Sequence, residues 1–348
     1  MDAQSIINDV GILEAFEGGA ASVTDVADSC SESRSTVYRF ISDAEDWCLL
    51  TTSSDEYTLT AAGMLVLREY RSLEDHEREA VSTVARFEYG FRLLEILDSS
   101  VVSKAEMTRR SGASRSTVQR IIEAFGEGTA NDDGWLEEPD GGFTLNSAGK
   151  RVLSTHLDFT NTIAVVDDKI EFLERYVNTD QLPPIEALDN SRLVVSTVTD
   201  NNNVVRELKR IDFDGITEFR GISQAFSGQL SDYYIANFPE DVDSRLIIDR
   251  NVYVAITHPK RWKYLFNINE WPNFTLRVHP DDVKVGLGLY DEQAVIAGYS
   301  EAKPFNAALF STNDVFYDWV ERVYESYDQD ALSPGKDLLR WGSSEIIG

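Results

Sequence analysis

Cysteine and histidine are scarce in this sequence of 348 residues. Cys30 and Cys48 are its two cysteines, so a disulfide framework is not expected, and both thiols are predicted to be reduced and partly buried. The four histidines are scattered, without any close His/Cys group of metal-ligand spacing. We therefore expect no metal site.

Long apolar runs and catalytic motifs are also missing. No stretch approaches the roughly 20 apolar residues of a membrane span, and the first ten residues, MDAQSIINDV, lack the basic-then-apolar pattern of a secretory signal. There is no glycine-rich phosphate loop and no Gly-x-Ser-x-Gly motif. These absences predict a soluble cytoplasmic protein that contacts no membrane, is not an enzyme and needs no cofactor.

Basic residues, lysine above all, are few. The chain has 60 acidic against 32 basic residues, and 9 of the basic residues are lysine. An acidic, lysine-poor composition resembles proteins of extreme halophiles, although an acidic protein from a low-salt organism is the alternative. Such a charge normally disfavours nucleic acid. At molar salt, however, the Debye length falls to about 3 Å, so only the charges at a contact surface would matter.

Two pairs of similar segments indicate an internal duplication. SRSTVYR at Ser33–Arg39 matches SRSTVQR at Ser114–Arg120, and TLTAAGMLVL at Thr58–Leu67 matches TLNSAGKRVL at Thr144–Leu153. The offset between copies is 81 for the first pair and 86 for the second, which places a five-residue insertion within Gly126–Gly134. Matches in the same order with a loop-sized gap favour duplication over chance.

Each copy is interpreted as three helices followed by a two-stranded hairpin. In the first copy we expect helices over 3–16 and 23–29, a third from an N-cap at Ser31 to about Trp47, a hairpin over 48–60 and a helix over 61–70. In the second we expect helices over 73–97, 104–111 and 114–125, and a hairpin pairing 135–138 with 143–146. This order is that of the winged helix-turn-helix, whose third helix enters the major groove of DNA.

The predicted fold class is α+β, with two tandem winged helix-turn-helix units before an α/β domain. The expected domains are residues 1–72 and 73–155 for the two units, 156–180 for a linker or dimerisation helix, and 181–348 for an effector or assembly domain. Helices over 73–97 and 147–177 carry apolar seams, for example Ala80, Val84, Phe87, Phe91 and Leu94. Such seams could pair two chains in a homodimer or pack within their own domain.

The start of each third helix supplies the candidate DNA-contacting residues. Arginine can grip guanine with two hydrogen bonds, and serine, threonine and free helix N–H groups suit phosphate. Tyr38 and Gln119 occupy the one position that differs, so the two copies should read different bases. The alternative is that Ser-Arg-Ser-Thr serves as a helix cap with a solvated face. The candidates are Ser33, Arg34, Ser35, Thr36, Tyr38 and Arg39, and in the second copy Arg109, Arg110, Ser114, Arg115, Ser116, Thr117, Gln119 and Arg120.

Local charge favours the second copy. Residues 1–70 hold 3 basic and 13 acidic residues, whereas residues 85–155 hold 9 basic and 11 acidic residues. The segment 109–120 contains four arginines and no acidic residue, and it is the most basic part of the chain.

The C-terminal half is interpreted as an α/β domain. Strands are expected over 192–198 and 246–248, an antiparallel meander over 275–278, 283–290 and 294–299, and helices over 204–211 and 314–327. Thr257, His258, Lys260 and Arg261 form a cluster that could hold an anionic ligand, the alternative being a solvated helix start. The turn 199–203, after a strand, is a second candidate ligand site.

The segments LRVHPDDVKVGLGLYDEQAVIAGYS and FNAALFSTNDVFYDWVERVYESY, with Trp319, Tyr324 and Tyr327 on the closing helix, resemble archaeal transcriptional regulators. The resemblance is to haloarchaeal regulators related to the methanogenesis filament regulator, and more distantly to TrmB-type regulators. It implies a sequence-specific regulator that binds double-stranded DNA, with a C-terminal domain that senses a small-molecule effector or mediates assembly. Two winged helices are legible here where the family shows one, so either copy could inherit the DNA role. The rival is a winged-helix adaptor that binds protein.

Overall fold

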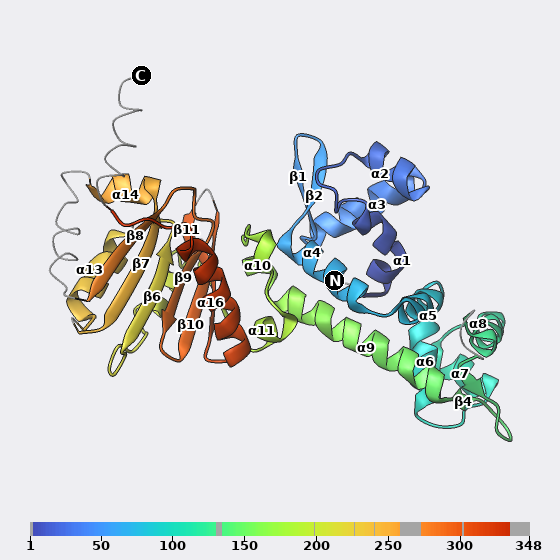
Figure 1. Cartoon of the computed structure of the whole chain (residues 1–348). Coiled ribbons are helices and arrows are strands. Elements are labelled where there is room, and N and C mark those ends of the chain that lie inside the picture. The colour runs from blue at the N-terminus through green and yellow to red at the C-terminus, as the bar shows by residue number, and fades with distance from the viewer. Residues whose placement is uncertain are drawn as a thin grey trace. The chain divides into compact units, whose positions relative to one another are not determined.

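The computed structural model describes residues 3–129, 134–197, 199–225, 227–239, 241–257, 273–300 and 303–334. The chain has a mixed α+β fold and divides into two compact units, Met1–Asp168 and Lys169–Gly348 (Figure 1). Within the described ranges, no helix is long and apolar enough to cross a membrane. Neither Cys30 nor Cys48 forms a disulfide bond, and both are half-buried.

The first unit contains a similar run of elements twice, and the second copy begins with one additional helix, α5. The first copy consists of α1 (Ala3–Glu14), α2 (Val23–Cys30), α3 (Arg34–Asp46), β1 (Leu50–Ser53), β2 (Glu56–Leu59) and α4 (Ala61–Ser72). The second consists of α5 (Asp75–Ala85), α6 (Gly90–Asp98), α7 (Lys104–Ser111), α8 (Arg115–Glu127), β3 (Leu136–Glu137), β4 (Thr144–Leu145) and α9 (Ser147–Asp168).

The hairpins of the two copies are tied to their helices by equivalent contacts. An isolated bridge joins Ala21 to Tyr57 in the first copy and Val102 to Phe143 in the second. The hydrogen bond from Leu49 N to Ala44 O in the first copy corresponds to the bond from Trp135 N to Phe125 O in the second. The donor positions differ by 86 and the acceptor positions by 81, so the five-residue insertion lies between Phe125 and Trp135.

In each copy a glycine allows the helix after the hairpin to pack closely against the hairpin backbone. A Cβ added to Gly63 would lie 2.2 Å from the Leu49 carbonyl oxygen, and one added to Gly149 would lie 2.5 Å from that of Trp135. Only glycine permits this closeness of helix to backbone. The shared Ala-Gly of the two sequence motifs therefore has a packing cause.

The N-cap of the third helix in the first copy lies two residues later than predicted. Ser31 is in the left-handed region (φ 57°) and ends α2, its N–H donating to the Ala27 carbonyl. Ser33 is the N-cap of α3, and its hydroxyl accepts from the Thr36 N–H. The prediction at Ser31 was wrong because both serines suit an N-cap and only the turn between the helices distinguishes them.

The expected single helix over 73–97 is two helices, α5 and α6. The chain turns at residues 86–89, and Gly90 then packs against the backbone of Val84, where an added Cβ would lie 2.2 Å from the carbonyl oxygen. Side-chain amides of the first copy bind backbone carbonyl groups at this break. Gln4 Nε2 donates to the Ala85 and Phe87 oxygens, and Asn8 Nδ2 donates to Ala85 O. A continuous apolar seam along 73–97 is therefore excluded.

Helix α9 packs against both copies, since it contacts α4 and α1 of the first and α5 and α6 of the second. The Tyr70 and Phe159 rings meet edge to face with centroids 5.8 Å apart. The expected continuation of this helix to residue 177 is interrupted at Lys169 (φ −107°, ψ 10°), after which α10 covers Ile170–Leu173.

The second unit is built on a seven-stranded sheet of order β5-β11-β10-β9-β6-β7-β8. Its strands are β5 (Arg192–Val195), β6 (Glu218–Ser223), β7 (Asp243–Asp249), β8 (Phe274–His279), β9 (Gly286–Tyr290), β10 (Gln293–Ser300) and β11 (Lys303–Ser311). β6, β7 and β8 are parallel to one another, and the remaining pairs are antiparallel.

The predicted meander was wrong in its first strand. β9 and β10 pair antiparallel as expected, but β8 lies at the far edge, separated from β9 by β6 and β7. Parallel strands need crossover connections, and α13 (Gly228–Asn237) and α14 (Arg250–Thr257) lie in the segments that join β6 to β7 and β7 to β8. β6 and β11 were not predicted from the sequence.

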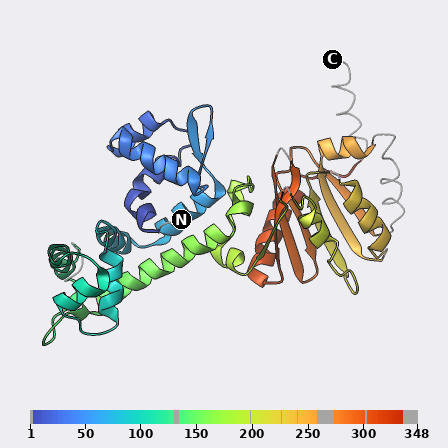
Figure 2. The same ribbon diagram turned by 180° about the vertical axis from the view of Figure 1, so that it is seen from behind.

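Helices lie on both faces of the sheet. α16 (Asp314–Asp328) lies across one face, where it buries Phe316, Trp319 and Val323, and α11 (Ile185–Asp189) contacts it (Figure 1). The opposite face, turned toward the viewer in Figure 2, carries α12 (Asn203–Leu208), α13 and α14. The two-residue alternation of β6 separates these faces, because Arg220 reaches Tyr317 and Glu321 of α16 whereas Phe219 packs against Tyr234 of α13.

Candidate nucleic-acid interface

The hydroxyl groups at the start of α3 and α8 form the same capping network. Ser114 Oγ accepts from Thr117 N at 3.1 Å and lies 2.9 Å from Ser116 Oγ and 2.8 Å from Thr117 Oγ1. In α3, Ser33 makes the equivalent contacts with Thr36 and Ser35 at identical distances. A capping role therefore explains part of the shared heptapeptide in both copies.

The arginine after each cap has no structural partner. Arg34 and Arg115 are exposed, and within the described ranges neither side chain forms a hydrogen bond or ion pair. Val37 and Val118, three residues further along each helix, are buried in the core. Because capping and packing do not use these guanidinium groups, both are available to an external ligand.

The position that differs between the copies also differs in its surroundings. Tyr38 is 64% exposed, so its ring projects from α3. Gln119 is half-buried and held by its neighbours: its Oε1 accepts from Lys104 Nζ at 2.8 Å, and its Nε2 donates to Glu123 Oε1 at 2.6 Å. Gln119 thus presents a fixed amide, rather than the freely projecting side chain that we expected.

The other three arginines of segment 109–120 contact protein groups. Arg109 pairs with Glu106, which lowers the pKa of that carboxyl and raises the pKa of Arg109. Arg110 lies 3.4 Å from Ser99 Oγ. The Arg120 guanidinium lies over the Phe87 ring, 5.7 Å from its centroid. Arg115 is therefore the least engaged of the four among the residues that the structure describes.

The helix before the candidate recognition helix is basic in one copy only. Lys104, Arg109 and Arg110 belong to α7, and the positions 81 residues earlier in α2 are Val23, Asp28 and Ser29. All three cations of the second copy are therefore missing from the first.

The cation at the other end of the first motif, Arg39, faces carboxylates. Asp9 lies close enough for Arg39 to oppose the rise that burial causes in the pKa of Asp9, and Glu32 and Asp43 add to that rise. At the hairpin tips, residues 53–56 (Ser-Ser-Asp-Glu) and 139–142 (Pro-Asp-Gly-Gly) contain no cation. The surface around α8 is therefore the more favourable one for an anionic polymer.

Comparison with known protein families supports this picture. The model of the HVO_A0261 N-terminal domain matches twice in tandem, at residues 3–80 and 78–168, as expected for a duplication. The middle domain of methanogenesis regulatory protein FilR1 matches residues 201–330. These matches support an archaeal regulator family. Transcription regulation and DNA binding are the functions that accompany it.

Solved structures offer only distant likenesses. TrmBL2, described as an archaeal chromatin protein with a novel mode of DNA binding, has a TM-score of 0.33 and 17% identity, covering 78% of this chain and 99% of its own. The N,N-8-amino-8-demethyl-D-riboflavin dimethyltransferase RosA of Streptomyces davawensis has a TM-score of 0.25 and 13% identity, covering 80% of this chain and 62% of its own. Likenesses at these scores carry no argument about activity. No curated protein matches the sequence.

Three of the ligand candidates in the C-terminal half lie outside the described residues: His258, Lys260 and Arg261. Thr257 is the last residue of α14, and its hydroxyl donates to Val254 O at 3.0 Å. The rest of the expected helix start lies outside the described residues. In the second candidate turn, Asp200 pairs with Arg206 and Asn203 Nδ2 donates to Val195 O, so these polar groups hold the turn on the sheet.

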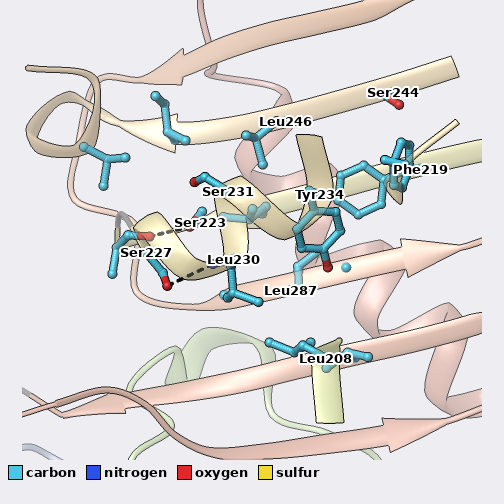
Figure 3. A pocket seen from close by; sticks show the side chains of 18 of the residues that line it. Leu208, Phe219, Ser223, Ser227, Leu230, Ser231, Tyr234, Ser244, Leu246 and Leu287 are labelled. Atoms are coloured by element: carbon cyan, nitrogen blue, oxygen red, sulfur yellow. Dashed lines mark hydrogen bonds between the residues drawn. The ribbon is translucent and has the colours of Figure 1, made fainter. Parts of the chain in front are cut away.

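The second unit contains a cavity of about 190 Å³ that was not predicted from the sequence. It lies between the sheet and helices α13 and α14, and Figure 3 shows Leu230 and Tyr234 of α13 with Leu246 of β7 in its wall. Its lining contains no Asp, Glu, Lys, Arg or His among the described residues. The sequence signal that could have predicted this cavity is GLGLY in β9, where glycine alternates with leucine. Glycines on one face of a strand leave space above that face.

Proposed function

We propose that the chain is a sequence-specific transcriptional regulator that binds double-stranded DNA through two tandem winged helix-turn-helix units, with α8 as the main recognition helix. The observation that carries the proposal is Arg115. It is exposed at the first position of α8 and lacks an ion pair with any described residue. A recognition helix uses its N-terminal residues to reach base edges.

The residues around Arg115 divide into base-reading and phosphate-binding groups. Arg115 donates two hydrogen bonds to guanine O6 and N7. Ser116, Thr117 and the free N–H groups of the helix start face phosphate oxygens. Arg110 and Arg120 add positive charge on either side of the helix start. Gln119, oriented by Lys104 and Glu123, pairs with an adjacent base edge.

The first copy of the repeat has a secondary role in this proposal. Arg34 and Tyr38 are exposed at the equivalent positions of α3, but α2 offers no cations and Arg39 faces carboxylates. In the salt-rich cytoplasm of a halophilic archaeon, screening confines these repulsions to the contact itself. A homodimer would place two such readers on a two-fold operator.

The C-terminal unit is proposed to sense a small molecule or to mediate assembly, and no catalytic role is proposed for it. The rival function is a protein-binding adaptor. The observation that favours the rival is Tyr38, which is 64% exposed on a strongly acidic surface.

A gel shift on promoter fragments at molar KCl tests the proposal with Arg115→Ala and the matched Arg34→Ala. The loss of a bidentate base contact should weaken binding of the preferred fragment by about 1–3 kcal/mol and relax discrimination. Arg34→Ala should have the smaller effect. Equal, sequence-blind binding by wild type and Arg115→Ala would refute the role of α8. Absence of binding by the wild type would favour the adaptor.

A further inference from the structure

The cavity of the second unit has a cause in the sheet beneath it. Gly221 of β6 pairs directly with Gly288 of β9, and Gly286 of β9 pairs with Ala297 of β10. Gly286, Gly288 and Ala297 line the cavity. At Gly221, Gly286 and Gly288 the centre of the sheet therefore carries no side chain of its own.

Aromatic rings close one end of the space. A Cβ added to Gly221 would lie 2.6 Å from Phe219 Cζ, and one added to Gly288 would lie 2.7 Å from Tyr290 Cε2, so both rings lean over the glycines of their own strands. Tyr234 of α13 joins this wall, its hydroxyl 2.6 Å from that of Tyr290. Burial raises the pKa of Tyr234 to about 12 and that of Tyr290 well above its usual range, so both hydroxyls stay neutral at pH 7.

The cavity divides the apolar core on this face. One buried cluster includes Leu230 and Phe238 with Tyr290, and a separate one includes Val252 and Ile256 of α14. Both clusters contribute to the lining. Leu230 is the one fully buried side chain of α13, although Tyr234 and Ile235 of the same helix also face the cavity. An apolar occupant would complete the packing of that helix.

Ser223 and Ser227 lie at the end opposite the aromatic wall, whereas Ser244 lies beside Phe219 (Figure 3). Ser223 Oγ donates to Ala225 O at 2.8 Å, which leaves its lone pairs free to accept. Ser227 Oγ accepts from Leu230 N at 3.4 Å, which leaves its proton free to donate. Ser223 is the last residue of the parallel strand β6 and Ser227 follows it, at the carboxyl end where ligands bind in open α/β sheets.

We infer that this cavity is a binding site for an uncharged, largely apolar molecule of one or two rings that carries a single hydroxyl or carbonyl group toward Ser223 and Ser227. The size follows from the volume, since an apolar cavity of about 150 Å³ holds benzene and this one has about 190 Å³. The neutrality follows from the lining, because an ionised group would lose its hydration without meeting an opposite charge among the described lining residues.

This inference rests on the sensor role in the proposed function and specifies the class of its ligand. Binding of the ligand to the cavity does not require DNA. The test measures calorimetric binding of 2-naphthol and of 2-naphthoate to the full-length protein in molar KCl at pH 7. The two probes share a ring system and differ in charge. We expect saturable binding of 2-naphthol, at least tenfold tighter than that of 2-naphthoate.

Two cavity-filling variants and one surface control locate the site. Ser231→Phe fills the space from α13, and Ala297→Leu fills it from the floor; each should weaken 2-naphthol binding at least tenfold. Ala236→Phe, on the exposed side of the same helix, should bind as wild type does. The inference is overturned if wild type does not bind 2-naphthol, if it binds both probes equally, or if a filling variant that retains the wild-type circular dichroism spectrum binds undiminished. Arg115→Ala should bind 2-naphthol normally, so failure of DNA binding and failure of this site are distinguishable.

Discussion

Replacing Gly63 with alanine tests the contact on which both copies of the first unit are built. The new Cβ would lie 2.2 Å from Leu49 O and 2.9 Å from Leu59 Cδ2. Ordinary contact begins at about 3.4 Å, so α4 would have to move away from the hairpin by roughly 1 Å. Overpacking of this kind costs about 1–3 kcal/mol, and the better helix propensity of alanine returns up to about 1 kcal/mol. We expect a net loss of about 1–2 kcal/mol in the free energy of unfolding.

Gly11 provides a matched control in the same copy. It is exposed in α1, and a Cβ added there would meet nothing within 4 Å. Gly11→Ala should therefore stabilise the unit by about 0.5–1 kcal/mol through helix propensity alone. Scanning calorimetry should show Tm lowered by roughly 2–8 °C in Gly63→Ala and raised by roughly 1–4 °C in Gly11→Ala. If Gly63→Ala is as stable as wild type, the close approach of helix and hairpin is not what positions α4.

Two further predictions concern the first unit. Ser114→Ala should lower the free energy of unfolding by about 1 kcal/mol, because the Thr117 N–H loses its cap, whereas Ser116→Ala should change it by less than about 0.5 kcal/mol; urea titration of both compares them, and equal losses would argue against the capping role. Burial raises the pKa of Asp9 in the folded chain, so the native state binds this proton more tightly than the unfolded state and stability falls as pH rises from 3.8 through the folded pKa. Asp9→Asn should thus be more stable than wild type at pH 7, with a gain that shrinks toward pH 3.8; a constant gain would assign the effect to another cause.

The sequence allowed good prediction where local chemistry decides the structure. The start of α8 and the hairpin before α9 followed from an N-cap serine and from a motif built on Gly149. The break before Gly90 was not visible, because no proline marks it and the side-chain amides that bind its carbonyl groups come from Gln4 and Asn8 of the other copy.

Contacts distant in sequence limited the prediction of the second unit. Val283–Tyr290 and Ala294–Tyr299 were expected to pair, and β9 and β10 do. The place of β6 between β9 and β7 depends on crossovers that leave no mark in the strands themselves. Similarly, Gly221 and Gly288 have no relation in the sequence until the register brings them together. The engagement of Gln119 by Lys104 also depends on how α7 crosses α8.

Helix α9 contacts both copies of the repeat, and α1 donates two side-chain amides to the turn between α5 and α6. The separation between α3 and α8 is therefore set by packing within one unit and not by a flexible tether. The distance between the two recognition helices of such a protein cannot adjust to DNA sites of different spacing. If both helices engage one duplex, their subsites must occur at a single spacing, and inserting five base pairs, about half a turn, would place the second subsite on the opposite side of the duplex.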